Sequence, residues 1–315
     1  MTEDRPAAAA TPPGTPPRLT RAEWGLLLVL AAVQFTHIVD FVILMPLGPE
    51  LEDALHITAK QFGWMVSSYA LGASLTGLLA ARFLDRFDRK RAVLVLYAGF
   101  TLGTLLCAAA PGFVTLVLAR AVAGGFAGVL AAGVLAIIGD AFPDARRGRA
   151  MGIIMSAFSV ASIVGVPAGL VLANSVGWRT PFVVLGLLST AVWVLAWRAL
   201  PSLRGHMAHA SEEATSLWDV LVQPAHVRAY TLMAALVLGS FTIIPYLSIY
   251  LVNNVGRNKT ELAYVWLFGG IATLLTMWVF GWLSDRFGKL LVFRVMAVVT
   301  LVTLCRLGWC EAGGT

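Results

Sequence analysis

Residues 81–91 read ARFLDRFDRKR and residues 281–289 read GWLSDRFGK, so one pattern occurs twice in the chain. In each copy an Asp-Arg pair and nearby basic residues stand between two long apolar runs. Pro46 and Pro245 occupy matching positions in the apolar runs that come earlier in each part. Similar features in the same order indicate an internal repeat. The sequence therefore predicts two related helical bundles, separated by the longest polar connection, residues 201–228.

The composition of the 315-residue chain excludes an ordinary soluble domain. Hydrophobic residues make up 58% and charged residues 13%, and the mean hydropathy is +0.80, whereas soluble domains carry about 25% charged residues. The apolar content also excludes intrinsic disorder. Cys107, Cys305 and Cys310 have neither zinc-ligand spacing nor the density of a disulfide scaffold. A chain of this composition folds in a lipid bilayer.

Nine apolar runs approach the length of about 20 residues that a membrane-spanning helix needs. They lie at about 24–47, 62–82, 92–110, 113–139, 150–173, 181–200, 229–252, 262–283 and 290–309. Most of the 23 Lys and Arg residues share one side of the membrane if the N-terminus is cytoplasmic. Since positive residues favour the cytoplasmic side, we expect a multi-pass protein of the inner (plasma) membrane with a cytoplasmic N-terminus.

The expected organisation has four segments. Residues 1–23, rich in Pro, Ala and Thr, form a disordered cytoplasmic tail. Residues 24–200 form a six-helix bundle, residues 201–228 a cytoplasmic linker, and residues 229–315 a partial bundle of three helices. Bundles that repeat in this way are typical of transporters. The fold class is therefore an all-α integral membrane protein with a complete first half and a partial second half.

The repeated loop resembles the cytoplasmic signature of the major facilitator superfamily, G-x-x-x-D-R-x-G-R-R/K. In the first copy Ala81 and Asp88 replace the two glycines. The residues that match are Asp85, Arg86, Arg89 and Lys90. The second copy is closer to the motif, and its matching residues are Asp285, Arg286 and Gly288. The resemblance implies that these residues form an inner gate, with Asp285 resting on the helix start near residues 148–151.

Two further motifs resemble the same family. Residues 120–124, Arg-Ala-Val-Ala-Gly, are similar to its R-x-x-x/Q-G motif, and residues 165–169, Gly-Val-Pro-Ala-Gly, look like a shifted antiporter motif. Together with Trp178 and Arg179 they resemble the drug/proton and sugar-efflux antiporter branch. The family pattern has twelve spans and nine fit before Thr315. The expectation is a fragment, a truncated gene or a functional short form.

Asp40 and Arg120 are the candidates for proton coupling. Both lie within apolar runs, at a similar depth of roughly 10 Å below the outer interface, and a charge inside hydrocarbon is costly unless paired. The pair is either a proton-coupling site, as the resemblance implies, or a static salt bridge. His37 lies one turn before Asp40 and is a second candidate for carrying the proton, or a packing residue.

Other polar and aromatic residues are candidates for a substrate cavity. These are Gln34, Phe41, Tyr246 and Tyr250, although the aromatic residues could equally face lipid or the core. Gly165, Pro167 and Gly169 are expected to permit close helix packing and to kink the helix that contains them.

These patterns favour a secondary active transporter that moves a small solute by alternating access, most simply by proton-coupled efflux. The alternative is a non-transporting truncated remnant or a membrane interaction protein, completed by self-association or by missing C-terminal helices. An enzyme is not expected, because the sequence has no Walker motif, G-x-S-x-G elbow or metal-ligand cluster. We expect no cofactor, no metal and no nucleic acid. The expected partners are a small-molecule substrate, protons and the lipid bilayer.

Overall fold

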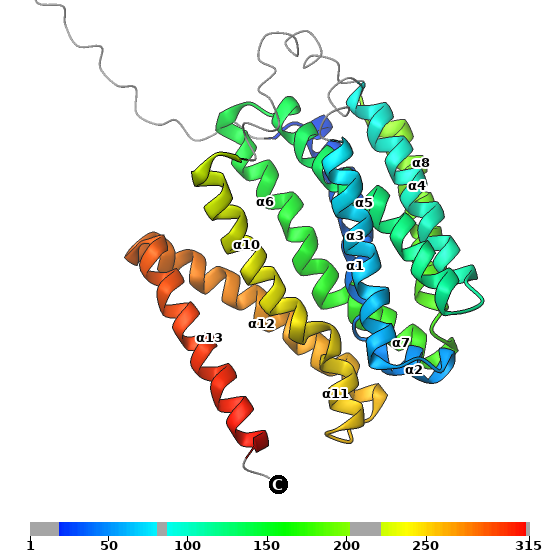
Figure 1. Ribbon diagram of the computed structural model, residues 1–315. Coiled ribbons are helices and arrows are strands. Elements are labelled where there is room, and N and C mark those ends of the chain that lie inside the picture. Colours follow the sequence, from blue (N-terminus) through cyan, green and yellow to red (C-terminus); the bar gives the residue numbers. More distant parts are fainter. Residues whose placement is uncertain (1–18, 81–86, 202–221, 313–315) are drawn as a thin grey trace, which may run out of the picture.

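The computed structural model describes residues 19–80, 87–201 and 222–312, and this part of the chain is helical without strands (Figure 1). The helices are α1 (Arg21–Ile43), α2 (Gly48–Leu55), α3 (Ala59–Ala80), α4 (Arg89–Ala109), α5 (Phe113–Ala141), α6 (Asp144–Val160), η2 (Ala161–Gly165), α7 (Val166–Val176), α8 (Thr180–Ala199), α10 (Pro224–Ile243), η4 (Ile244–Tyr246), α11 (Leu247–Asn253), α12 (Lys259–Phe287) and α13 (Lys289–Ala312).

The described residues of each of the nine predicted runs lie largely in helices, and the all-helical fold class is confirmed. Seven helices of the described chain, counting two interrupted helices as one each, are long and apolar enough to cross a membrane. One helix, α2, was not predicted, because it lies between the first two apolar runs and its eight residues include three acidic ones. A turn over residues 44–47 ends α1, and Pro49 in the first turn of α2 suits a new helix start. The predicted tail and linker lie mostly outside the described residues, at 1–18 and 202–221.

Local sequence signals fix several helix ends. At α1, Thr20 and Glu23 form a capping box, in which each side chain satisfies a backbone N–H of the first turn. Asp88 caps α4 by accepting a hydrogen bond from the Lys90 backbone N–H at 2.9 Å. At the C-terminal end of α12, Gly288 is the capping residue, and its φ of 89° lies in the region that glycine adopts without strain.

Small residues bring helices of the first half into close contact. A Cβ added at Gly124 would overlap the Tyr69 backbone, and one added at Gly72 would overlap the Ala121 carbonyl. These contacts press α3 against α5. Gly165 and Gly169 likewise have no room for a side chain, because the Val39 and Ile43 side chains of α1 fill the space. α1 and the α7 region therefore approach each other closely at these two glycines.

Two prolines, Pro167 of the predicted kink and Pro245 of the repeat, coincide with irregular helix. Pro167 lies in the first turn of α7, directly after the π-helical turn η2. Pro245 lies within the 3-10 turn η4, between α10 and α11. Proline has no N–H to donate and crowds the preceding turn, which accounts for the altered hydrogen-bond register at both places.

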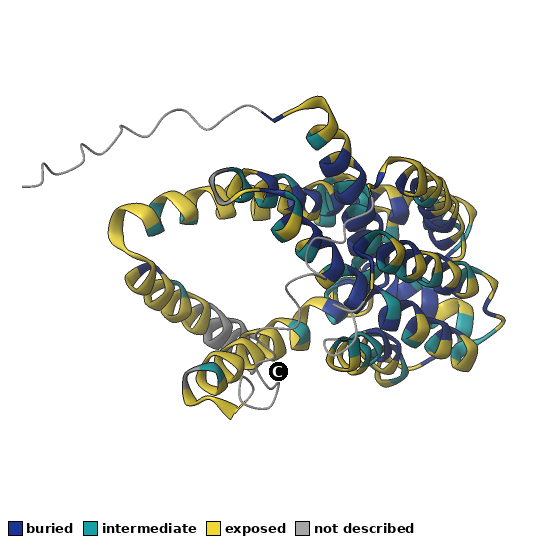
Figure 2. Ribbon diagram, turned by 90° about the horizontal axis from the view of Figure 1, so that it is seen from above, coloured by how far each residue is buried: buried dark blue, intermediate teal, exposed yellow. Residues whose placement is uncertain are grey.

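The bundle has two ends, which we name by their contents. The α2 end holds α2 and the loop between α11 and α12, whereas the basic end holds the start of α4 and the start of α6, with Arg89, Lys90, Arg91 and residues 146–149. Buried residues concentrate in the helices before residue 201 (Figure 2). In the most apolar window of the span His226–Asn253 only 17% of residues are buried, against 56% in α1. The second part of the chain therefore packs against the first over a limited area.

Candidate functional site

Asp40 and Arg120 form a salt bridge in the interior of the first half. The Arg120 Nη1 lies 2.8 Å from the Asp40 Oδ2, and Asp40 and Arg120 are 0% and 1% exposed. The Thr104 hydroxyl donates to the Asp40 Oδ1 at 3.1 Å. Three helices, α1, α4 and α5, thus meet at a single carboxylate. The structure brings together the two residues that the sequence pairs by depth.

The end of α1 explains why Arg120 is held here. The last four carbonyls of a helix have no partner within the helix, and Asp40 belongs to the last turn of α1. The Arg120 Nη1 also donates to the Asp40 backbone carbonyl at 3.0 Å. One guanidinium therefore neutralises the carboxylate and satisfies an orphan carbonyl, which makes the burial of both charges tolerable.

An aromatic chain connects this pair to the second part of the molecule. The Arg120 guanidinium lies 4.3 Å from the ring centroid of Tyr69. The Tyr69 ring lies 5.2 Å from that of Phe41, which in turn lies 5.7 Å from that of Phe241 in α10. Arg120 is thus connected to α10 through successive aromatic contacts. Within the described chain, the Tyr69 hydroxyl and the Gln34 Oε1 are buried and lack a hydrogen-bond partner.

His37 does not join the Asp40 carboxylate. Its Nδ1 lies 3.1 Å from the carbonyl oxygen of Gln34, in the same helix. This contact within one helix agrees with a packing role for His37. A role of His37 in carrying the proton stays a prediction.

The predicted cavity residues from the second part lie towards the α2 end. The Tyr246 ring meets Phe62 edge-on, with centroids 6.2 Å apart, and its hydroxyl occupies the space over Gly63. Tyr250 is 42% exposed. Tyr246 thus helps to join η4 to α3, and a role in lining a substrate cavity remains a prediction for both tyrosines.

A polar cluster closes the same end. The Lys259 Nζ lies 2.6 Å from the Asp53 Oδ2 and 3.2 Å from the Glu50 Oε1, so α12 is tied to α2. The Asn253 side chain donates to the Glu52 Oε2 at 3.3 Å. Burial raises the pKa of Glu52, an effect that the Asn253 hydrogen bond opposes. Beneath these groups the Ile249 side chain of α11 packs on Gly48 of α2. Together these contacts hold α11 and α12 against α2 and close the α2 end.

The described residues contain no group of three or more His, Cys, Asp or Glu side chains that could hold a metal ion. The candidate site consists of the Asp40–Arg120 ion pair with the hydroxyl groups and aromatic rings around it.

The family model of the Major Facilitator Superfamily matches residues 30–314. The chain belongs to this superfamily. Together with its apolar helices, this membership makes the chain a multi-pass membrane protein.

Relatives and solved structures of the superfamily agree with this assignment. The chain is 28% identical over 261 residues to YceJ, an uncharacterised MFS-type transporter of Bacillus subtilis, covering 82% of this chain and 66% of that protein. It is 23% identical over 294 residues to a probable sugar efflux transporter of Mannheimia succiniciproducens, covering 92% and 72%. The chain thus spans about two thirds of the length of these relatives, whose names describe transporters and not enzymes.

Two crystal structures share the fold. A bacterial homologue of the human lysosomal transporter Spinster, in an inward-facing and unoccupied conformation, superposes with a TM-score of 0.68 at 18% identity, covering 86% of this chain and 64% of that one. The D-xylose–proton symporter superposes with a TM-score of 0.64 at 15% identity, covering 84% and 69%.

The superfamily motif is only partly visible. Asp85 and Arg86 lie outside the described residues. Arg89 donates from Nε to the Asp140 Oδ2 at 2.9 Å, which ties the start of α4 to the end of α5. The motif residue Lys90 contributes its backbone N–H to the Asp88 cap.

The second copy of the motif does not form the expected latch in this structure. Asp285 is exposed, and no hydrogen bond or ion pair joins it to residues 148–151, which are described. Arg286 instead lies 5.5 Å from the Trp282 ring centroid. The reason is the path of α12: it packs on η2 and α7 up to Gly270, and beyond that residue it diverges from α6 (Figure 1).

Sequence reasoning missed Thr104, Tyr69 and Lys259. Thr104 lies in an apolar run, where a lone hydroxyl residue gives no signal. Tyr69 was one aromatic residue among many. Lys259 is one of few cations between the last apolar runs, and opposite the acidic stretch 50–53 it was a detectable sign of a contact between the two parts.

Proposed function

We propose that the chain is a secondary active transporter, or the larger part of one, in which Asp40 binds the coupling proton and Arg120 is its counter-charge. The observation that carries the proposal is the fully buried Asp40–Arg120 pair at 2.8 Å, reached by Thr104 and linked to α10 through Tyr69 and Phe41. Ionisable residues within a membrane are costly, and in transporters they mark ion pathways.

The conformation supports alternating access. The α2 end is closed by Tyr246, Ile249 and the Lys259 cluster, whereas α12 is exposed from Ile271 to Val279 as it nears the basic end. Since basic residues favour the cytoplasmic side, we assign the basic end to the cytoplasm of the plasma membrane and the α2 end to the outside. The structure then corresponds to a state open towards the cytoplasm.

Proton binding would act on this pair in one defined step. A proton that adds to the Asp40 Oδ2 neutralises the carboxylate, so the guanidinium loses its counter-charge but keeps the Asp40 carbonyl and the Tyr69 ring as partners. Arg120 is then free to bond another acceptor, including a solute. Because Tyr69 and Phe41 lie between Arg120 and α10, this shift is coupled to the second part of the bundle.

The solute proposed is a small molecule with hydroxyl groups, and the direction is efflux. The buried Gln34 Oε1 and Tyr69 hydroxyl are available for hydrogen bonds, and aromatic rings such as Phe41 provide a flat apolar surface. Relatives named as sugar efflux transporters make sugars the first probes.

The test is gradient-driven transport in everted membrane vesicles that contain the full chain. Labelled hexoses, pentoses and nucleosides, and the hydrophobic cation ethidium, are supplied outside while the vesicle interior is acidified. We expect uptake of one class, its loss in Asp40→Asn with binding retained, and damage to both in Arg120→Ala. Glu261→Gln, which removes an exposed carboxylate, is the control. Unchanged gradient-driven uptake in Asp40→Asn would reject the coupling role.

A further inference from the structure

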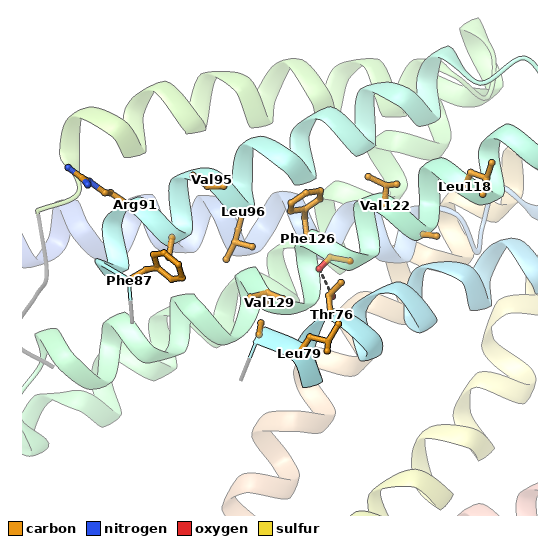
Figure 3. A pocket seen from close by; sticks show the side chains of 14 residues that line it. Thr76, Leu79, Phe87, Arg91, Val95, Leu96, Leu118, Val122, Phe126 and Val129 are labelled. Atoms are coloured by element: carbon orange, nitrogen blue, oxygen red, sulfur yellow. Dashed lines mark hydrogen bonds between the residues drawn. The ribbon is translucent and has the colours of Figure 1, made fainter. Parts of the chain in front are cut away.

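A groove on the side of the first half is unrelated to the Asp40 site (Figure 3). It has a volume of about 790 Å³ and lies between α3 and α4, over α5. Both α3 and α4 pack closely on α5 but touch each other little, so the intervening face of α5 stays uncovered. Small residues, Ala121 and Gly125, form part of the floor, while bulkier Leu79 and Leu96 rise at the sides.

The wall of this groove is apolar along its length. Thr76 is the one neutral polar residue of the lining. Its hydroxyl donates to the Gly72 and Gly125 carbonyl oxygens, at 2.8 and 2.6 Å, and is therefore already satisfied. Apolar side chains at the surface are strongly exposed, including Leu79 at 66% and Val95 at 67%. In a membrane this surface meets lipid, and a concave apolar surface accepts an acyl chain.

Arg91 gives the groove a charged end. It is the one ionisable residue of the lining, it lies in the first turn of α4 at the basic end, and it is exposed. Within the described residues it has no acidic partner at salt-bridge distance, unlike Arg89, which pairs with Asp140. Figure 3 shows Arg91 and Phe87 at one end of the groove and Leu118 at the other.

The groove is long enough for an acyl chain. The α5 residues of the lining, Leu118 to Val129, alone span about 16 Å at 1.5 Å per residue, and the groove continues past Val129 to Arg91 of α4 (Figure 3). Half of the hydrocarbon core is about 15 Å thick. An acyl chain whose headgroup is at the level of Arg91 can therefore lie on this apolar wall through the whole of its leaflet.

We propose that this groove binds one acidic phospholipid of the leaflet at the basic end, with an acyl chain along α5 and the headgroup phosphate on the Arg91 guanidinium. Guanidinium groups bind phosphate through paired N–H donors, and basic pockets between transmembrane helices hold anionic headgroups.

Native mass spectrometry of the purified full chain in detergent tests the proposal. The protein is mixed with equal amounts of phosphatidylglycerol and phosphatidylcholine that have the same acyl chains. We expect a preference for phosphatidylglycerol that falls about fivefold in Arg91→Gln, the effect of one basic residue near an anionic headgroup. Arg149→Gln, an exposed arginine of the same end outside the groove, serves as the matched control. Equal preferences in wild type and Arg91→Gln would overturn the headgroup assignment.

A second pair of variants tests the acyl-chain site. Val122→Trp fills the groove from a position that is 42% exposed, whereas Val183→Trp changes an equally exposed position, 41%, elsewhere. We expect Val122→Trp alone to lower retention of both lipids, and a photoreactive phosphatidylglycerol to label residues 118–129. Labelling outside residues 118–129 would overturn the lipid site. If the chain instead forms a dimer that Val122→Trp dissociates, the groove binds a second copy of the chain and the lipid site is likewise overturned. Neither result bears on the proton-coupling proposal.

Discussion

Replacing Arg120 by Met should strongly destabilise the protein. The Asp40 carboxylate is 0% exposed, and without Arg120 its one remaining side-chain donor among the described residues is Thr104. Breaking a buried ion pair by removing one partner costs about 3–5 kcal/mol, because an uncompensated charge is left behind. Asp40→Asn should cost less, about 1.5–3 kcal/mol, the worth of a charge-assisted hydrogen bond, since Arg120 keeps the Asp40 carbonyl and the Tyr69 ring.

The double variant distinguishes a charge pair from two independent packing residues. In Asp40→Asn/Arg120→Met no charge is buried, so its loss of stability should fall short of the sum of the single losses by about 2 kcal/mol, within the range for residues in direct contact. The assay is reversible unfolding in mixed micelles of a mild detergent and dodecyl sulfate, followed by circular dichroism.

An exposed arginine with similar partners provides the comparison. Arg179 donates to the Ala110 carbonyl at 2.9 Å and lies 4.3 Å from the Trp178 ring centroid, as Arg120 does with its carbonyl and ring, but it has no carboxylate partner in the described chain. Arg179→Met should therefore cost clearly less than Arg120→Met. Additive effects of Asp40→Asn and Arg120→Met, within about 0.5 kcal/mol, would refute the reasoning.

Three further outcomes follow from the contacts of α7 and of the α2 end. Gly165→Val should lower stability by about 1–3 kcal/mol through overpacking against α1, whereas Gly152→Val, which meets no atom, should change it little in the same unfolding assay. Lys259→Met should broaden and lengthen the distance between spin labels on α2 and α11, because it removes both ion pairs to α2; an unchanged distance distribution would exclude the cluster as a clasp. Burial raises the pKa of Glu52 in the closed contact, so its protonated form favours closure: the closed population should grow as pH falls through that raised pKa and shrink as pH rises through it, and Glu52→Gln should remove this dependence from the spin-label distances.

The sequence was most informative where the lipid environment allows few alternatives, namely for the spanning helices and for buried charges. Helices were predictable from the length of apolar runs, and two charges at equal depth had few other partners, so the Asp40–Arg120 contact could be inferred. The faces by which helices pack were not predictable. In lipid both the packed and the exposed face of a helix are apolar, so periodicity carries little information.

Other features of the structure could not be predicted from the sequence, because they depend on how the helices pack. The contact of Tyr246 with Phe62 was not predicted, and its role in lining a cavity stays a prediction. Asp285 was expected at a latch, yet it is exposed in this structure, because the path of α12 beyond Gly270 leads away from α6, which the local motif does not reveal. The groove over α5 arises from small residues that also read as ordinary helix packing.

Infrared difference spectroscopy tests the central claim most directly, since it observes protonation of a carboxyl group without knowledge of the solute. Spectra of the full chain in lipid are recorded between acidic and alkaline buffer for wild type, Asp40→Asn and the control Glu261→Gln. If Asp40 binds the coupling proton, a carboxyl C=O band from a buried group appears at acidic pH in wild type and in Glu261→Gln, and is missing in Asp40→Asn. A band that persists unchanged in a correctly folded Asp40→Asn protein would contradict the account and leave the pair as a structural salt bridge.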